Sequence, residues 1–320
     1  MEIEVATSHE ARTASAASAP AAAGRAVLRF HLAMVGCLVA VNLVALGICH
    51  ATSTTVSLDQ LAGILKGGAP LWAPLLVVAA YAWKAASPRL LESSALIVWC
   101  WILTVGFSLP ILAMARLRYP LRDASFAAFD EGLGFSVGAV APWVTAHPRL
   151  HALMAGSYDS LKFAAVGAAL AALIRNDRGT VRALVAGGMM SLTTATLVSA
   201  FVPAVGPWVA YGMPASATQA RCAAAIEMAR RSGPILLDLS YPKIVCFPSF
   251  HVILAVLSAW TLGRAWKPLR VPAVIWGGLI VASTVLLGWH YLFDALGGMV
   301  VASTCIAVTS RGPFVVRGSS

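Results

Sequence analysis

The sequence is poor in charged residues. Only 11% of its 320 residues are Asp, Glu, Lys or Arg, whereas 59% are hydrophobic, and the mean hydropathy is +0.80. A soluble globular domain carries about 25% charged residues, so this composition excludes one. Several apolar runs have the roughly 20 residues that a helix needs to cross a membrane, and no ~10-residue segments alternate as in a transmembrane β-barrel. The sequence therefore predicts an all-α protein, a polytopic transmembrane helix bundle.

The sequence also lacks a recognisable metal or cofactor motif. It has six cysteines and no Cys-x-x-Cys pair, so no metal and no cofactor are expected. Four of the cysteines fall in or beside apolar runs, where cysteine usually acts as a small hydrophobic residue. Cys222 and Cys246 share one predicted loop, and the sequence leaves open whether they pair.

The formal net charge of +10 does not come from one basic patch. Lys and Arg are scattered between the apolar runs, so we expect no nucleic-acid partner. A bias of basic residues toward the inner loops of a membrane protein explains the charge better.

The order of apolar and polar segments predicts four parts. Residues 1–24 form a disordered tail, 25–92 a transmembrane hairpin, 93–310 the main transmembrane domain and 311–320 a cytoplasmic tail. Eight spans are expected, and the prolines in 69–86 leave six or seven possible. The spans are 27–49, 69–86, 94–115, 157–174, 181–203, 249–266, 271–288 and 291–310.

The distribution of Lys and Arg predicts the orientation of these spans. With the N-terminus inside, every short inner loop is basic, as the positive-inside rule requires. His251 and His290 then fall on the outer side. The abundance of Ala, Val, Gly and Arg favours a bacterial source, so the outer side would be the periplasmic face of the inner membrane.

Two short stretches carry titratable residues in the most apolar third of the chain. One reads Pro248-Ser-Phe-His251, and the other reads Gly288-Trp-His-Tyr-Leu-Phe-Asp294. Ionisable groups in such segments are costly and usually functional. His290 and Asp294 are four residues apart, which brings both side chains to one face of a helix. We expect His290 in the first helical turn, where free N–H groups favour an anion.

These motifs resemble those of the type 2 phosphatidic acid phosphatase superfamily. Pro248-Ser-Phe-His251 is similar to its motif Pro-Ser-x-His, and Ser283-Thr-x5-His290-x3-Asp294 is similar to Ser-Arg-x5-His-x3-Asp, with Thr284 in place of the arginine. The residues at the motif positions are most similar to those of the branch related to inositol phosphorylceramide synthases. The resemblance implies a six-helix phosphatase-type core, preceded here by about two extra spans.

The resemblance also implies roles for the motif residues. His290 would be the nucleophile that forms a phosphohistidine, Asp294 would orient its ring, and His251 would protonate the leaving group and then activate the acceptor. Ser249 would donate a hydrogen bond to the phosphate, and Ser283 belongs to the same motifs. Asp123 and Asp130 resemble a segment that precedes the catalytic half in this branch, without an assigned role.

The missing arginine requires another cation, because threonine cannot neutralise a phosphate. Four candidates lie in the loop before Pro248. They are Arg221, Arg230, Arg231 and Lys243. Arg231 is favoured, because Arg-x-Gly upstream of Phe-Pro-Ser-x-His looks like a recurrent feature of the branch.

The predicted function is a membrane phosphatase or phosphotransferase acting on a lipid phosphate or phospholipid at the extracytoplasmic face, without a metal. Headgroup transfer of the inositolphosphotransferase type is the first alternative. A non-catalytic protein that binds phosphate or lipid is the second. A vanadate-dependent haloperoxidase is disfavoured, because such sites depend on Lys and Arg residues that are missing here.

Overall fold

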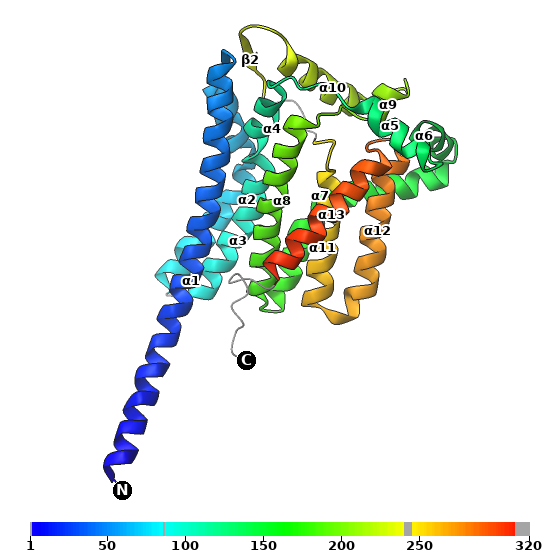
Figure 1. Cartoon of the computed structure of the whole chain (residues 1–320). Coiled ribbons are helices and arrows are strands. Elements are labelled where there is room, and N and C mark those ends of the chain that lie inside the picture. Colours follow the sequence, from blue (N-terminus) through cyan, green and yellow to red (C-terminus); the bar gives the residue numbers. More distant parts are fainter. Residues whose placement is uncertain (1, 86, 240–244, 311–320) are drawn as a thin grey trace.

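The structure is a computed structural model that describes residues 2–85, 87–239 and 245–310, and it is an all-α helix bundle (Figure 1). The predicted fold class is therefore confirmed. The long helices are α1 (Glu2–Ala51), α2 (Leu58–Lys84), α3 (Pro88–Val105), α7 (Pro148–Ile174), α8 (Arg178–Phe201), α11 (Phe250–Ala265), α12 (Arg270–Leu286) and α13 (Leu292–Thr309). Shorter helices are α4 (Ser108–Ala115), α5 (Asp123–Gly132), α6 (Val137–Thr145), α9 (Pro207–Ala210), α10 (Ala217–Arg230) and the 3-10 helix η1 (Lys267–Leu269).

The apolar helices identify an integral membrane protein. Six described helical segments are long and apolar enough to cross a membrane, and two shorter apolar segments, Ala73–Ala82 and Phe250–Ala265, match the remaining predicted spans. The six are Arg25–Ala51, Arg89–Ala115, Pro148–Ile174, Arg178–Phe201, Lys267–Leu286 and Leu292–Thr309. The second predicted span lies in α2, which contains Pro70 and Pro74.

The first helix is longer than its predicted span. Residues 2–24, for which the composition predicts a disordered tail, continue α1 as helix (Figure 1). This stretch is rich in alanine, the residue with the highest helix propensity. The predicted tail at 311–320 lies outside the described residues.

Helix α11 occupies the centre of the C-terminal half. It packs against α7, α8, α12 and α13. Gly298 allows the close approach of α13, since a Cβ at this position would lie 2.7 Å from the carbonyl oxygen of Ser249. The backbone N–H of Ser249 in turn donates to the carbonyl of Asp294. This hydrogen bond joins the start of α11 to the start of α13, and the two motif histidines lie at or beside these helix starts.

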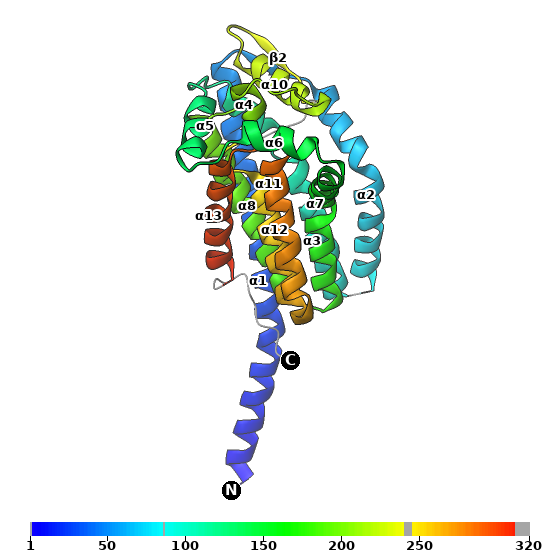
Figure 2. The same cartoon turned by 90° about the vertical axis from the view of Figure 1, so that its right-hand side faces the viewer.

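A layer of short helices covers one end of the bundle. Figure 1 shows α5, α6, α9 and α10 across the end where α11 and α13 begin, and Figure 2 shows α5, α6 and α10 there from another side. A parallel pair of strands, β1 (Thr54–Val56) and β2 (Ile235–Leu237), belongs to this layer. Buried Arg116 ties it together by donating to the carbonyls of Thr52, Ala229, Arg231 and Gly233.

The opposite end of the bundle is basic. The turns that join α2 to α3, α7 to α8 and α11 to α12 lie there (Figure 1). Arg178 and Arg182 at this end share Glu92 as an ion-pair partner. The other basic residues of these turns are Lys84, Arg89, Arg175, Arg264, Lys267 and Arg270.

Candidate active site

The two motif histidines and the aspartate meet where α11 and α13 begin. His251 is the second residue of α11, and Asp294 lies in the first turn of α13. His290 was expected in that same first turn, but α13 begins only at Leu292, so His290 belongs to the preceding turn. Gly288 makes this turn possible, because its φ of 71° is accessible to glycine at little cost.

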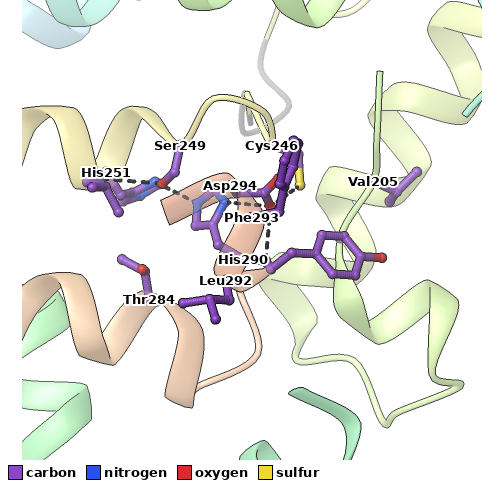
Figure 3. A network of polar contacts seen from close by, with 12 residues as sticks. Val205, Cys246, Ser249, His251, Thr284, His290, Leu292, Phe293 and Asp294 are labelled. Carbon is purple, nitrogen blue, oxygen red and sulfur yellow. Dashed lines mark hydrogen bonds and ion pairs between the residues drawn. The ribbon is translucent and has the colours of Figure 1, made fainter. Parts of the chain in front are cut away.

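The three side chains form a linear series of polar contacts (Figure 3). Nε2 of His290 lies 3.4 Å from Nδ1 of His251, and Nδ1 of His290 lies 3.5 Å from Oδ2 of Asp294. His290 and Asp294 are both fully buried. One nitrogen of the His290 ring thus lies beside a carboxylate, without a hydrogen bond between them, while the other nitrogen faces a second imidazole.

The backbone N–H groups at the start of α13 already have acceptors. Tyr291 N–H donates to Oδ2 of Asp294 at 2.9 Å. Leu292 and Phe293 donate to the carboxylate of Asp130, at 2.7 and 3.0 Å. The sequence predicts an anion at this helix start, and in the structure the position is taken by the protein's own Asp130.

Asp123 supports the same segment from the other end of α5. It accepts the backbone N–H groups of Val205 and Gly206 and the hydroxyl of Tyr291, the last at 3.0 Å. Tyr291 is fully buried, and Asp123 is 7% exposed. Burial raises the pKa of Tyr291, so its hydroxyl keeps the proton that it donates. The two aspartates of the segment 123–134 thus hold the three residues that follow His290.

The start of α11 retains donors for an anion. Ser249 is the N-cap residue, is fully buried, and its Oγ accepts a hydrogen bond from Val252 N–H. Within the described chain, the N–H groups of Phe250 and His251 have no protein acceptor. This helix start therefore offers two backbone donors beside the imidazoles, and helix N-termini favour phosphate.

Cys246 is a contact of the site that the sequence analysis missed. Its thiol donates to Oδ2 of Asp294 at 3.0 Å, and burial raises its pKa well above the ordinary value. Ligand atoms of Cys246, His290 and Asp294 lie within 4.8 Å of one another, so these residues form a possible metal-ligand set. Cys222 and Cys246, whose pairing the sequence left open, are free thiols.

Tyr158 is a second contact that the sequence analysis missed. Its hydroxyl lies 3.0 Å from Nε2 of His251, and its ring stacks on that imidazole with the centroids 5.2 Å apart. Its ring also stacks on Trp289. Tyr158 comes from α7, far from both motifs in the sequence. The only local signal is the polar segment Ser157-Tyr-Asp159 within an apolar run.

The motif position usually filled by arginine has a structural role here. The Thr284 hydroxyl donates to the carbonyl of Val281, and the Thr284 carbonyl accepts the N–H groups of Trp289 and His290. Ser283 is also fully buried and donates to the carbonyl of Ile280. Neither hydroxyl has a described contact with His251 or His290.

The four candidate cations differ in their positions. Arg231 is 67% exposed and forms an ion pair with Glu227, and Arg221 is also exposed. Arg230 is partly buried and lines a cavity of about 40 Å³ together with Cys246. Burial and the nearby Arg118 lower its pKa. Lys243 lies outside the described residues.

Burial sets the protonation state of His290. The fully buried ring has its pKa lowered to about 4, so the imidazole is neutral at neutral pH. A neutral imidazole carries a lone pair on one of its two nitrogens, and such a nitrogen can act as a nucleophile.

Comparison with known proteins identifies the family of the chain. The family model of the PAP2 superfamily matches residues 124–308, which is more than half of the 320-residue chain and contains both motifs. Neither the curated proteins nor the solved structures contain a significant match.

Proposed function

Because the chain belongs to the PAP2 superfamily, we propose that it is a membrane-embedded enzyme that removes or transfers a phosphoryl group of a lipid through a phosphohistidine. Family membership supports a phosphatase or phosphotransferase activity. The observation that carries the finer proposal is the position of His290 between the Asp294 carboxylate and the His251 imidazole.

In the proposed reaction, Nε2 of His290 attacks phosphorus and the bond to the leaving oxygen breaks. Protonated His251 donates its proton to that oxygen. Asp294 holds the proton on Nδ1 of His290, so positive charge on the phosphorylated ring is stabilised. In the second half, His251 removes a proton from water or an alcohol, which attacks phosphorus and releases His290. The N–H groups of Phe250 and His251 and the Ser249 hydroxyl would bind the phosphoryl oxygens.

The two rings must separate during this reaction. The 3.4 Å between Nε2 of His290 and Nδ1 of His251 leaves no room for a phosphoryl group between them. His251 is the ring that can move, because it is only partly buried and sits at a helix start, whereas His290 is fully buried. We propose that phosphate entry displaces the His251 ring away from His290.

A lipid is the proposed substrate because the histidines open helices within a transmembrane bundle. A headgroup can reach them while its acyl chains stay in the bilayer. The proposed orientation places this end on the extracytoplasmic side, because the other end carries the basic turns. In a bacterium this would be the periplasmic side of the inner membrane.

Arg230 is the proposed substitute for the missing motif arginine. It lines the same small cavity as Cys246, which contacts Asp294. Arg231, which the sequence favoured, is exposed and paired with Glu227, so we rank it below Arg230.

The proposal is tested by phosphate release from purified protein and its His290→Ala variant. The panel contains phosphatidic acid, phosphatidylglycerol phosphate and undecaprenyl pyrophosphate, with a chelator and without added metal. Release by the wild type alone is expected. Equal release by both proteins would contradict the nucleophile.

Two further conditions separate the alternative functions. Labelled lipid with inositol detects transfer to an alcohol if no phosphate is released. Loss of activity with the chelator would instead assign a metal to Cys246, His290 and Asp294. Absence of both release and transfer would favour the non-catalytic alternative.

A further inference from the structure

A cavity of about 840 Å³ lies between α11, α12 and α13, away from the histidines. Its volume falls within the range of roughly 300–1,000 Å³ that is common for ligand sites. Val256, Val281 and Met299 form part of its apolar wall. Val274 also lines it and is 64% exposed, so the cavity opens at the side of the bundle. In a membrane this side faces lipid.

Three cations surround the other part of the cavity. Arg264, Lys267 and Arg270 line it and are exposed. None of them has an ion-pair partner in the described part of the chain, whereas Arg178 and Arg182 at the same end share Glu92. Arg264 donates to the Thr180 hydroxyl and lies over the Trp260 ring, and both contacts leave its charge uncompensated.

We infer that this cavity binds an anionic phospholipid of the surrounding bilayer, with the headgroup on Arg264, Lys267 and Arg270 and the acyl chains along α11, α12 and α13. Basic pockets between transmembrane helices bind anionic headgroups in this way. A soluble phosphate compound would use only the cations and leave the apolar wall unoccupied. A lipid matches both parts of the cavity. The cations belong to the segment that joins α11 to α12, which Figure 2 shows at the end of the bundle opposite α5 and α6.

This lipid is not the proposed substrate. His251 and Arg264 lie at opposite ends of α11, and their separation in sequence corresponds to about 20 Å of helix. A headgroup held by Arg264 therefore cannot reach His290. The site would belong to the opposite leaflet.

Gly278 allows the apolar part of the cavity to be filled without disturbing the helix packing. A Cβ on Gly278 would meet no atom within 4 Å, whereas one on the adjacent Gly277 would lie 2.9 Å from the Cβ of Ala259. Gly278 lines the cavity. The variant Gly278→Leu thus blocks the acyl-chain region while leaving all three cations in place.

The test measures lipid binding by native mass spectrometry of the purified, delipidated protein, with phosphatidylglycerol and phosphatidylcholine of equal chain length. We expect wild-type protein to retain phosphatidylglycerol preferentially. The triple variant Arg264→Gln/Lys267→Gln/Arg270→Gln should weaken this binding at least about tenfold, since each cation contributes about 1 kcal/mol. Gly278→Leu should weaken it as well.

The control removes the same charge at the same end of the bundle. Arg25, Arg29 and Arg89 are exposed there, and their triple replacement by Gln should leave the preference for phosphatidylglycerol unchanged. Equal loss in both triple variants would overturn the site. Equal competition by glycerol phosphate would assign the cations to a soluble anion, and loss of a dimer in Gly278→Leu would assign the cavity to a second copy of the chain. These readouts do not depend on turnover.

Discussion

Asp130 accepts the backbone N–H of Leu292 at 2.7 Å, across 162 residues of sequence. This bond, with the one from Phe293, fixes the start of α13 two residues after His290. A carboxylate at a helix N-terminus also interacts favourably with the helix dipole. The short helix α5 thereby controls the position of the candidate nucleophile.

Replacing Asp130 should therefore affect both stability and turnover. Asp130→Ala leaves two partly buried N–H groups without their acceptors, which should lower the free energy of unfolding by about 1–3 kcal/mol. A shift of about 1 Å at His290 can lower kcat by roughly 100-fold. Glu131→Ala removes an exposed neighbouring carboxylate and should change neither quantity. Thermal unfolding and initial rates in one detergent measure both, and wild-type kcat in Asp130→Ala would refute the positioning role.

Tyr158 should contribute to turnover through His251. Tyr158→Phe keeps the stacked ring and removes only the hydroxyl that contacts Nε2 of His251. Loss of one hydrogen bond of about 0.5–1.5 kcal/mol should lower kcat roughly 2- to 10-fold. The control is Tyr119→Phe, which alters an exposed tyrosine. An equal effect of the two substitutions would show that the His251 contact does not assist the reaction.

The negative charge of Asp294 should be required for turnover, so even a substitution that preserves the volume of the side chain should lower the rate. Asp294→Asn keeps a carbonyl acceptor but removes the charge that stabilises a positive His290 ring and selects its tautomer. We expect kcat to fall by roughly 10²–10⁴-fold, with the protein still folded. The measurement is turnover at equal amounts of folded protein, and a fall below about threefold would exclude the proposed orientation of His290.

The pH dependence should reflect the buried state of His290. Its pKa is lowered from 6.5 to about 4, so below pH 6.5 the unfolded chain takes up a proton that the native ring does not. The free energy of unfolding therefore falls as the pH drops from about 6.5 to 4 and becomes constant below that.

The same pKa predicts the shape of the activity profile. The fall of kcat/KM on the acidic side reflects the pKa values of essential groups in the free enzyme. The fall that is caused by protonation of His290 should therefore have its midpoint near pH 4. Rates measured between about pH 3.5 and 8 test this. A His290-dependent limb between pH 6 and 7 would contradict a buried, neutral ring.

Gly298 should be sensitive to even a methyl group. The Cβ of Gly298→Ala would lie 2.7 Å from the Ser249 carbonyl, so α11 and α13 must move apart. Overpacking of this kind costs about 1–3 kcal/mol, and the contacts between His251 and His290 should loosen. Gly167→Ala in α7 meets no atom within 4 Å and should leave unfolding and turnover unchanged or raise stability slightly. Comparable thermal midpoints for the two variants would argue against the close approach.

The sequence by itself determined the fold class and the three residues at the centre of the candidate site. The scarcity of charge and the length of the apolar runs required transmembrane helices, because each property acts locally along the chain. His251, His290 and Asp294 could be recognised because they belong to motifs in which the spacing of the residues along the chain is fixed. The spacing of His290 and Asp294 brought them together although His290 lies before the helix.

Only the tertiary structure decided which other residues contact these three. Tyr158 contacts His251 across 93 residues, and Cys246 contacts Asp294 across 48. Asp130 touches none of the three, but it holds the start of α13 beside them, across 162 residues. The preference for Arg230 over Arg231 likewise depends on which of two adjacent side chains turns toward the cavity beside Cys246. Such contacts depend on how helices pack, and no local pattern of residues encodes them.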